Sequence, residues 1–167
     1  MEKISINPFI DAVQEAFDSM VGYPANRIEA LPAPSQVHLP DLIGVIGLSG
    51  TAQGVVALRF PMTTALAVIN AMAGASFDKV DAAVIDGIGE LVNIVTGCAK
   101  GKLKGHTISI SLPTVVSGDI CRLSNAKDTV WVEVPFESKL GVFSLVLTLK
   151  QVVANRQEVA REGVNSR

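Results

Sequence analysis

A long segment of helical periodicity in the middle of the chain, from Asp78 to Lys104, constrains the fold most strongly. We interpret it as a central helix that ends near Gly101 or Gly105. A helix advances by about 100° per residue, which places the apolar residues of this segment on one stripe. These residues are Val84, Ile88, Leu91, Val95 and Cys98. The fold must therefore supply an apolar surface beneath one face of a long helix.

The segments before the central helix indicate a helix, a hairpin and a second helix. Asn7-Pro8 is a start signal, a capping side chain followed by proline at the first helical position. A short helix capped by Thr63 or Thr64 is then expected to end at Gly74. Between the two helices lie two strand-like runs, joined by a polar loop of hairpin length: Leu42–Leu48 and Gly54–Phe60.

The segments after the central helix indicate strands, at Thr107–Leu112, Thr129–Phe136 and Gly141–Leu149. Pro135 predicts that the second strand ends there or lies at an edge, because proline cannot donate to a sheet ladder. This order of elements predicts an α+β fold, with a largely antiparallel sheet and helices packed on one face. We expect a single domain over residues 1–154 and a polar tail over residues 155–167.

Composition and charge exclude several classes of protein. The 167 residues are 49% hydrophobic and 18% charged, which favours a single folded domain over a disordered chain. The apolar runs are far shorter than the ~20 residues that span a bilayer, and no signal peptide is evident. The net charge of -2, with mostly scattered cations, offers no case for nucleic-acid binding. We therefore expect a cytoplasmic protein without a membrane or nucleic-acid partner. The two cysteines, Cys98 and Cys121, show no metal-ligand spacing, and we expect no metal site.

A second stripe of the central helix, about 60° wide, is polar and faces away from the apolar one. It carries Asp86, Glu90, Asn93 and Gly97. Asn is a poor helix former, and each interior glycine costs about 1 kcal/mol relative to alanine. Such a local loss of stability is typical of a place where a partner or another backbone comes close. The alternative is that Gly87 and Gly89 admit a neighbouring helix and the carboxylates are ordinary surface charges. The residues alone leave both interpretations open.

The pattern Asp86-x-x-x-Glu90-x-x-Asn93-x-x-x-Gly97 resembles the signature helix of the CheC/CheX family of chemotaxis phosphatases. Two flanking segments resemble the same family and occur in the same order. One is the opening Ile6-Asn7-Pro8-Phe9, and the other is Pro113-Thr114-Val115-Val116-Ser117-Gly118. The resemblance spans roughly residues 5 to 150.

The resemblance implies a phosphatase that removes phosphate from an aspartate of a CheY-like response regulator. It assigns the catalytic role to Asn93, which would orient the attacking water, and to Glu90, which would pair with a lysine of the regulator. Asp86 and Gly97 would belong to the partner-binding surface. The protein would need no cofactor of its own, because Mg²⁺ would be held by the phosphorylated partner. One Glu-x-x-Asn site per chain resembles the CheX type, which implies a homodimer.

Two other functions compete with this hypothesis. The same helix face could bind a receiver domain, in chemotaxis or another two-component pathway, without hydrolysing anything. The chain could instead be a structural dimeric domain whose polar stripe is solvated or lies at an interface. A phosphate-lifetime assay separates the phosphatase from the binding module. A double substitution of Glu90 and Asn93 tests the structural domain.

Overall fold

The computed structural model describes residues 4–32, 41–118 and 131–152. Three α-helices, one π-helical turn and seven strands are present in these ranges. In chain order they are α1 (Asn7–Ala16), η1 (Phe17–Val21), β1 (Asn26–Arg27), β2 (Asp41–Gly50), β3 (Ala52–Pro61), α2 (Met62–Ala73), α3 (Ala82–Lys102), β4 (Ile108–Ile110), β5 (Thr114–Gly118), β6 (Val132–Ser138) and β7 (Gly141–Gln151). The expected tail, residues 155–167, lies outside the described residues, as do the first two residues of the strand expected at 129–136.

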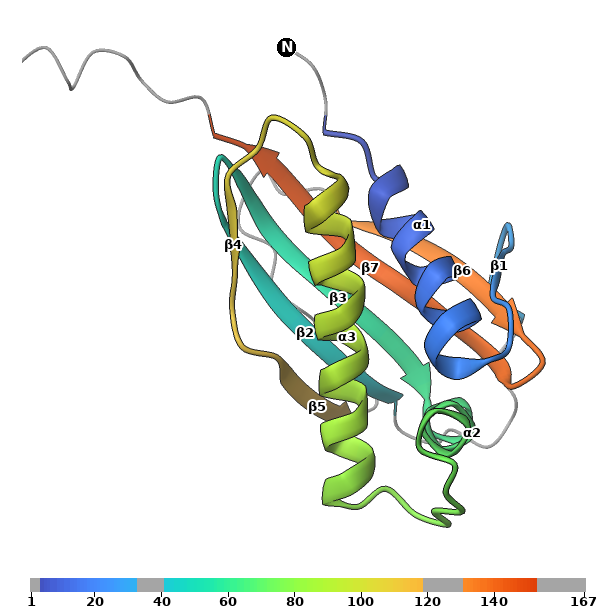
Figure 1. Ribbon diagram of the computed structural model, residues 1–167. Coiled ribbons are helices and arrows are strands. Elements are labelled where there is room, and N and C mark those ends of the chain that lie inside the picture. Colours follow the sequence, from blue (N-terminus) through green and yellow to red (C-terminus); the bar gives the residue numbers. More distant parts are fainter. Residues whose placement is uncertain (1–3, 33–40, 119–130, 153–167) are drawn as a thin grey trace, which may run out of the picture.

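The strands form one sheet in the order β1-β6-β7-β3-β2-β4, and β5 also pairs with β2. Every pairing between the described strands is antiparallel. Helices α1 and α3 lie side by side over one face of the sheet, and α2 lies at one end of it (Figure 1). The predicted fold class, an α+β domain with helices on one face of an antiparallel sheet, is confirmed.

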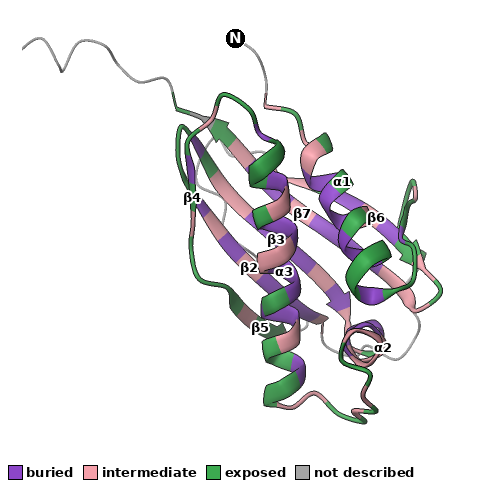
Figure 2. Ribbon diagram, viewed as in Figure 1, coloured by how far each residue is buried: buried purple, intermediate pink, exposed green. Residues whose placement is uncertain are grey.

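The core fills the space between this helical layer and the sheet, where buried residues of both layers face each other (Figure 2). Phe143 of β7 is its aromatic centre. Its ring stacks on those of Phe17, Phe60 and Phe136, with centroids 4.5, 5.1 and 5.3 Å away. Helix α3 approaches β2 closely at Gly44, where a Cβ would lie 3.1 Å from Ile88. The absent side chain at Gly44 thus lets the central helix settle onto the sheet.

The helix starts differ from those expected. Asn7 begins α1 but does not cap it. Its backbone N–H donates a hydrogen bond to Ser5 Oγ at 3.2 Å. Helix α2 begins directly after Pro61 without a side-chain cap. Neither threonine caps α2, and Thr64 is buried against Gly141, the first residue of β7. Packing into the core therefore replaces the capping role predicted for that side chain.

Helix α3 begins four residues later than the periodicity predicted. Asp81 is its N-cap, and its Oδ1 accepts hydrogen bonds from the backbone N–H groups of Ala83 and Val84 at 3.0 and 3.1 Å. The helix ends at Lys102, close to the predicted end. By length and composition alone α3 could cross a membrane, but 44% of its apolar window is buried inside the fold. It serves here as the central helix of the core.

The later strands differ from the predicted ones in two places. Strand β4 ends at Ile110, and β5 is a separate strand that the sequence analysis did not predict. Pro135 does not end its strand, because β6 continues to Ser138. Its carbonyl accepts a hydrogen bond from the backbone N–H of Ile28 at 3.0 Å, next to the two-residue edge strand β1. The missing N–H of Pro135 therefore faces the short edge strand, where it disrupts little pairing.

Candidate functional site

The four residues predicted for the site form one row on the outer face of α3. Asp86, Glu90 and Gly97 are exposed, and Asn93 is half-buried. The row opposite faces the sheet and is fully buried (Figure 2): Val84, Ile88, Leu91 and Val95 are each 0% exposed. Cys98, expected on that buried row, is only half-buried and lies at its margin. The rest of the predicted division between core face and outer face matches the structure.

Glu90 is exposed and Asn93 is half-buried, and neither side chain has a hydrogen bond or ion pair within the described chain. Among the described residues, the hydrogen bonds from side chains within α3 come from Thr96, Cys98 and Lys102. Glu90 and Asn93 are three residues apart, a spacing that places two side chains as neighbours on one helix face. A carboxylate and a carboxamide are therefore presented together on a rigid helix.

The glycines of α3 have different surroundings. A Cβ on Gly87 would lie 2.9 Å from Ile69 Cδ1 of α2, so this glycine is needed for packing between the two helices. A Cβ on Gly89 would meet Pro113 and Val115 at an ordinary 3.6 Å. A Cβ on Gly97 would meet nothing within 4 Å. The neighbouring-helix interpretation is thus correct for Gly87, whereas internal packing gives no reason for glycine at position 97.

The C-terminal half of α3 is joined to α1 by a small polar cluster. Glu15 of α1 accepts a hydrogen bond from Lys102 Nζ at 2.6 Å and one from the Cys98 thiol at 3.1 Å. The Lys102 contact, followed by that of Cys98, lowers the pKa of the Glu15 carboxyl. The pKa of the Cys98 thiol is raised, first by partial burial and then by the neighbouring carboxylate. This cluster links the two helices at the surface, and the raised pKa leaves less of the thiol as the reactive thiolate.

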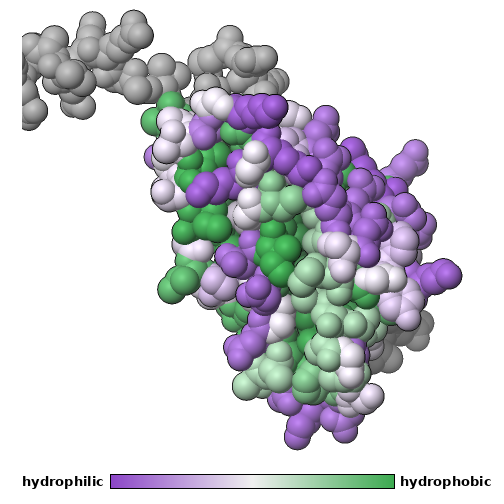
Figure 3. Space-filling view, in the orientation of Figure 1, coloured by the Kyte–Doolittle hydropathy of each residue, from purple (hydrophilic) through white to green (hydrophobic). Residues whose placement is uncertain are grey.

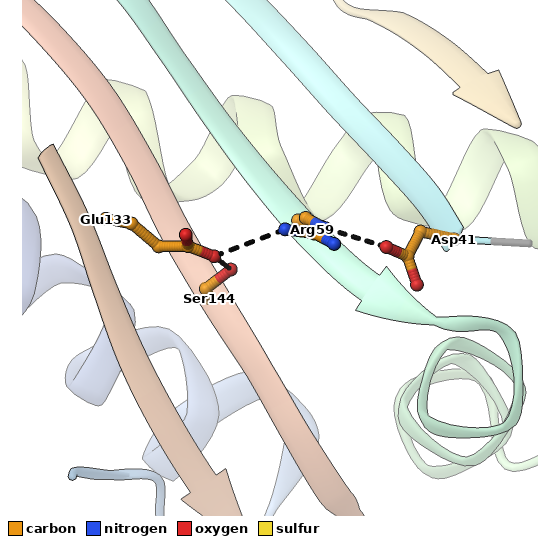
Figure 4. A network of polar contacts seen from close by, with 4 residues as sticks. All are labelled: Asp41, Arg59, Glu133 and Ser144. Carbon is orange, nitrogen blue, oxygen red and sulfur yellow. Dashed lines mark hydrogen bonds and ion pairs between the residues drawn. The ribbon is translucent and has the colours of Figure 1, made fainter. Parts of the chain in front are cut away.

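A second polar network lies on the sheet face opposite the helices (Figure 4). Arg59 of β3 donates from Nε to Asp41 of β2 at 2.7 Å and from Nη1 to Glu133 of β6 at 3.4 Å. Ser144 of β7 donates to the same Glu133 oxygen at 2.7 Å. The four side chains satisfy one another across four strands. We therefore interpret this network as a link between strands.

The surface around the outer row of α3 changes character along the helix (Figure 3). Hydrophobic residues gather over the N-terminal half of α3 and over α2, and hydrophilic residues over α1. Ala82, Ala83 and Ile85 are exposed in the apolar part. The described residues contain no group of three or more His, Cys, Asp or Glu side chains that could hold a metal ion. The carboxylate and carboxamide thus stand at the border of an apolar surface.

Two sequence comparisons place the chain among known proteins. The family "Chemotaxis phosphatase CheX" matches residues 42–137, a range that includes all of α3. The curated CheY-P phosphatase CheX of Thermotoga maritima is 32% identical over 122 residues, which cover 71% of this chain and 78% of that protein. The resemblance predicted from the residues of α3 and its flanking segments is confirmed.

Solved structures give the same result for the fold. A CheC-like superfamily protein from Shewanella sp. PV-4 is 29% identical, with a TM-score of 0.76 over 90% of this chain and 99% of that one. CheX of Borrelia burgdorferi, in a complex with CheY, BeF3 and Mg²⁺, is 22% identical, with a TM-score of 0.69 over 89% of this chain and 100% of that one. The chain therefore belongs to the CheX family of chemotaxis phosphatases, within the CheC-like superfamily.

Proposed function

We propose that this protein hydrolyses the aspartyl phosphate of a CheY-like response regulator, with Glu90 and Asn93 as its catalytic pair. The name of the Thermotoga relative and the CheY bound to the Borrelia protein support this choice of substrate. One observation about this chain carries the proposal. The two side chains stand together on the outer face of α3, where neither has a hydrogen bond to another described residue.

Asn93 is assigned the task of orienting the attacking water. A carboxamide donates and accepts hydrogen bonds, so it can hold a water in line with the phosphorus without changing its own charge. Positioning of this kind contributes much of the rate in phosphoryl transfer, where little covalent chemistry is left to the protein. We assign the Mg²⁺ to the regulator, where it neutralises charge on the phosphoryl group.

Glu90 is assigned to docking, as the partner of a lysine on the regulator. Its carboxylate lies one turn before Asn93 on a helix whose opposite face is buried in the core. The spacing between the two side chains is therefore fixed by a rigid element. Asp86 extends the acidic part of the row by one further turn. The open space over Gly97 leaves room for the regulator's backbone. We propose, from the resemblance, that the chain works as a cytoplasmic homodimer with one site per chain.

The test is the lifetime of phosphate on a purified, phosphorylated receiver domain. Wild-type protein is expected to shorten it, and Asn93→Ala to lose about 100-fold or more of that acceleration. Asn26→Ala is the matched control, because it removes an exposed carboxamide from β1, the edge strand at the opposite end of the sheet order from β2 and β4. Binding of the regulator with an unchanged phosphate lifetime would favour a non-catalytic binding module. Equal activity of wild type and Asn93→Ala would overturn the assignment of the catalytic residue.

A further inference from the structure

The segment that joins β4 to β5, residues 111–113, stands beside the outer row of α3, and we name it the Leu112 ridge. Its contact with the helix is at Gly89, where a Cβ would lie 3.6 Å from Pro113 Cγ. Gly89 directly precedes Glu90 and lies one helical turn before Asn93. The ridge is therefore the immediate neighbour of the proposed catalytic pair on one side of α3.

The ridge is held at both ends, although its middle residue has almost no contact with the fold. The backbone N–H of Ser111 donates to the Gly47 carbonyl at 3.0 Å, and its Oγ accepts from the Gly47 N–H at 2.9 Å. The same Oγ donates to the Leu112 carbonyl at 2.9 Å. On the other side, Pro113 has a fixed φ and leads directly into β5, which is paired with β2. The backbone of Leu112 is thus constrained.

The side chain of Leu112 is 87% exposed, the largest value among the exposed large hydrophobic residues of the described chain. A single exposed leucine on a protein surface is ordinary. Leu112 differs because its backbone is held and because further apolar surface adjoins it. Ile85, one turn before Gly89 on the same side of α3, is 38% exposed, and Val115 is half-buried beside Gly89. Together they form an apolar border along the α3–β5 seam.

The size of an ordinary protein interface shows how far a bound regulator extends from Asn93. A specific complex buries about 800 Å² on each partner, which corresponds to a disc about 16 Å in radius. A disc of that size centred on Glu90 and Asn93 reaches well beyond Gly89, the point at which the ridge contacts the helix. A regulator that brings its phosphorylated aspartate to Asn93 therefore also covers the ridge.

We propose that the Leu112 ridge is a docking contact for the response regulator, with the Leu112 side chain packed against apolar surface beside the regulator's phosphorylation pocket. The inference rests on the proposed function, because it takes the regulator's position from Asn93. The ridge sets affinity and the orientation of the complex. It contributes no group to the chemistry.

The test measures the dissociation constant of a BeF3-activated, Mg²⁺-bound receiver domain, together with kcat and KM for its phosphorylated form. Leu112→Ser is expected to raise Kd and KM about tenfold, with kcat within about twofold of wild type. Leu112→Met keeps the apolar area and is expected to bind as wild type does. Met20→Ser is the matched control. Met20 is 46% exposed on η1, which directly follows α1, and α1 and β5 lie on opposite sides of α3 (Figure 1). None of these variants is expected to shift the unfolding midpoint.

Two results would overturn the proposal. One is an unchanged Kd for Leu112→Ser. The other is a change of oligomeric state in that variant, measured by light scattering, which would show that a second copy of this chain covers the ridge. The proposed function fails separately. If Asn93→Ala keeps full activity while Leu112→Ser weakens binding, the catalytic assignment is wrong and the docking contact stands.

Discussion

Helix α3 presents two rows of side chains with different surroundings. The inner row, Val84, Ile88, Leu91 and Val95, is fully buried against the sheet and α1. On the outer row, Asp86, Glu90 and Gly97 are exposed and Asn93 is half-buried. Packing inside the fold explains each residue of the inner row. The outer carboxylate and carboxamide, Glu90 and Asn93, have no hydrogen bond within the described chain, which supports the proposal that they serve a partner.

The largest expected effect on stability separates the two rows directly. Leu91→Ala is expected to lower the free energy of unfolding by about 2–5 kcal/mol, because it removes a fully buried side chain and leaves a cavity. Asn93→Ala is expected to change it by less than about 0.5 kcal/mol. Urea denaturation of both variants measures the difference. A large stability loss in Asn93→Ala would place that residue in the fold and break the comparison.

The glycines sharpen the same comparison with a smaller effect. Gly87→Ala would bring a Cβ to 2.9 Å from Ile69, a side chain that is itself 3% exposed. The overpacking cost, about 1–3 kcal/mol, exceeds the gain of about 1 kcal/mol in helix propensity. We expect a net destabilisation of about 1 kcal/mol, visible as a lower urea midpoint. An unchanged midpoint would show that α2 moves aside easily.

Gly97→Ala is expected to act in the opposite direction. Nothing lies within 4 Å of the added Cβ, so only the helix propensity changes, and stability should rise by up to about 1 kcal/mol. The same substitution should weaken binding of the regulator if its backbone approaches α3 at this point. Denaturation and a binding titration on one sample measure both effects. Stabilisation with unchanged affinity would remove Gly97 from the partner-binding surface.

The smallest expected effect concerns the polar cluster between α1 and α3. The pKa of the Glu15 carboxyl is lowered in the folded state, chiefly by its hydrogen bond with Lys102. Its contribution to stability is therefore fully present above the ordinary pKa of a glutamate and is lost as the pH falls through the lowered value. Glu15→Gln should flatten the acid side of the stability profile slightly, as measured by thermal unfolding between neutral and acid pH. A profile identical to that of wild type would show that solvent screens the pair completely.

Periodicity predicted most of the two rows of α3, because a helix buries and exposes side chains at regular intervals. Cys98 departs from the pattern and lies half-buried at the margin of the inner row. The hairpin of β2 and β3 was predicted for a similar reason, from two apolar runs with a polar loop between them. Residue types within α3 also indicated the candidate site, since Asn and Gly are unusual choices for a solvated helix face. The assignment of Glu90 and Asn93 as a catalytic pair stays a prediction.

The errors arose where tertiary contacts outweighed local signals. Thr64 has the chemistry of a cap but is buried beside Gly141. Strand β5 is short and follows a proline, and it is a strand only because β2 provides pairing partners. Leu112 was expected to be the last residue of a strand, and it lies exposed beyond the end of β4. Its position beside α3 depends on contacts distant in sequence, at Gly47 and Gly89, which no local pattern predicts.

The proposed hydrolysis depends most on the carboxamide of Asn93, and its most direct test is the rate of phosphate loss from a regulator saturated with protein. Asn93→Asp keeps the size of the side chain but replaces the amide donor with a negative charge. We predict that this variant binds the regulator and unfolds much as wild type does, while phosphate is lost no faster than from the regulator alone. A wild-type rate in Asn93→Asp would contradict the account.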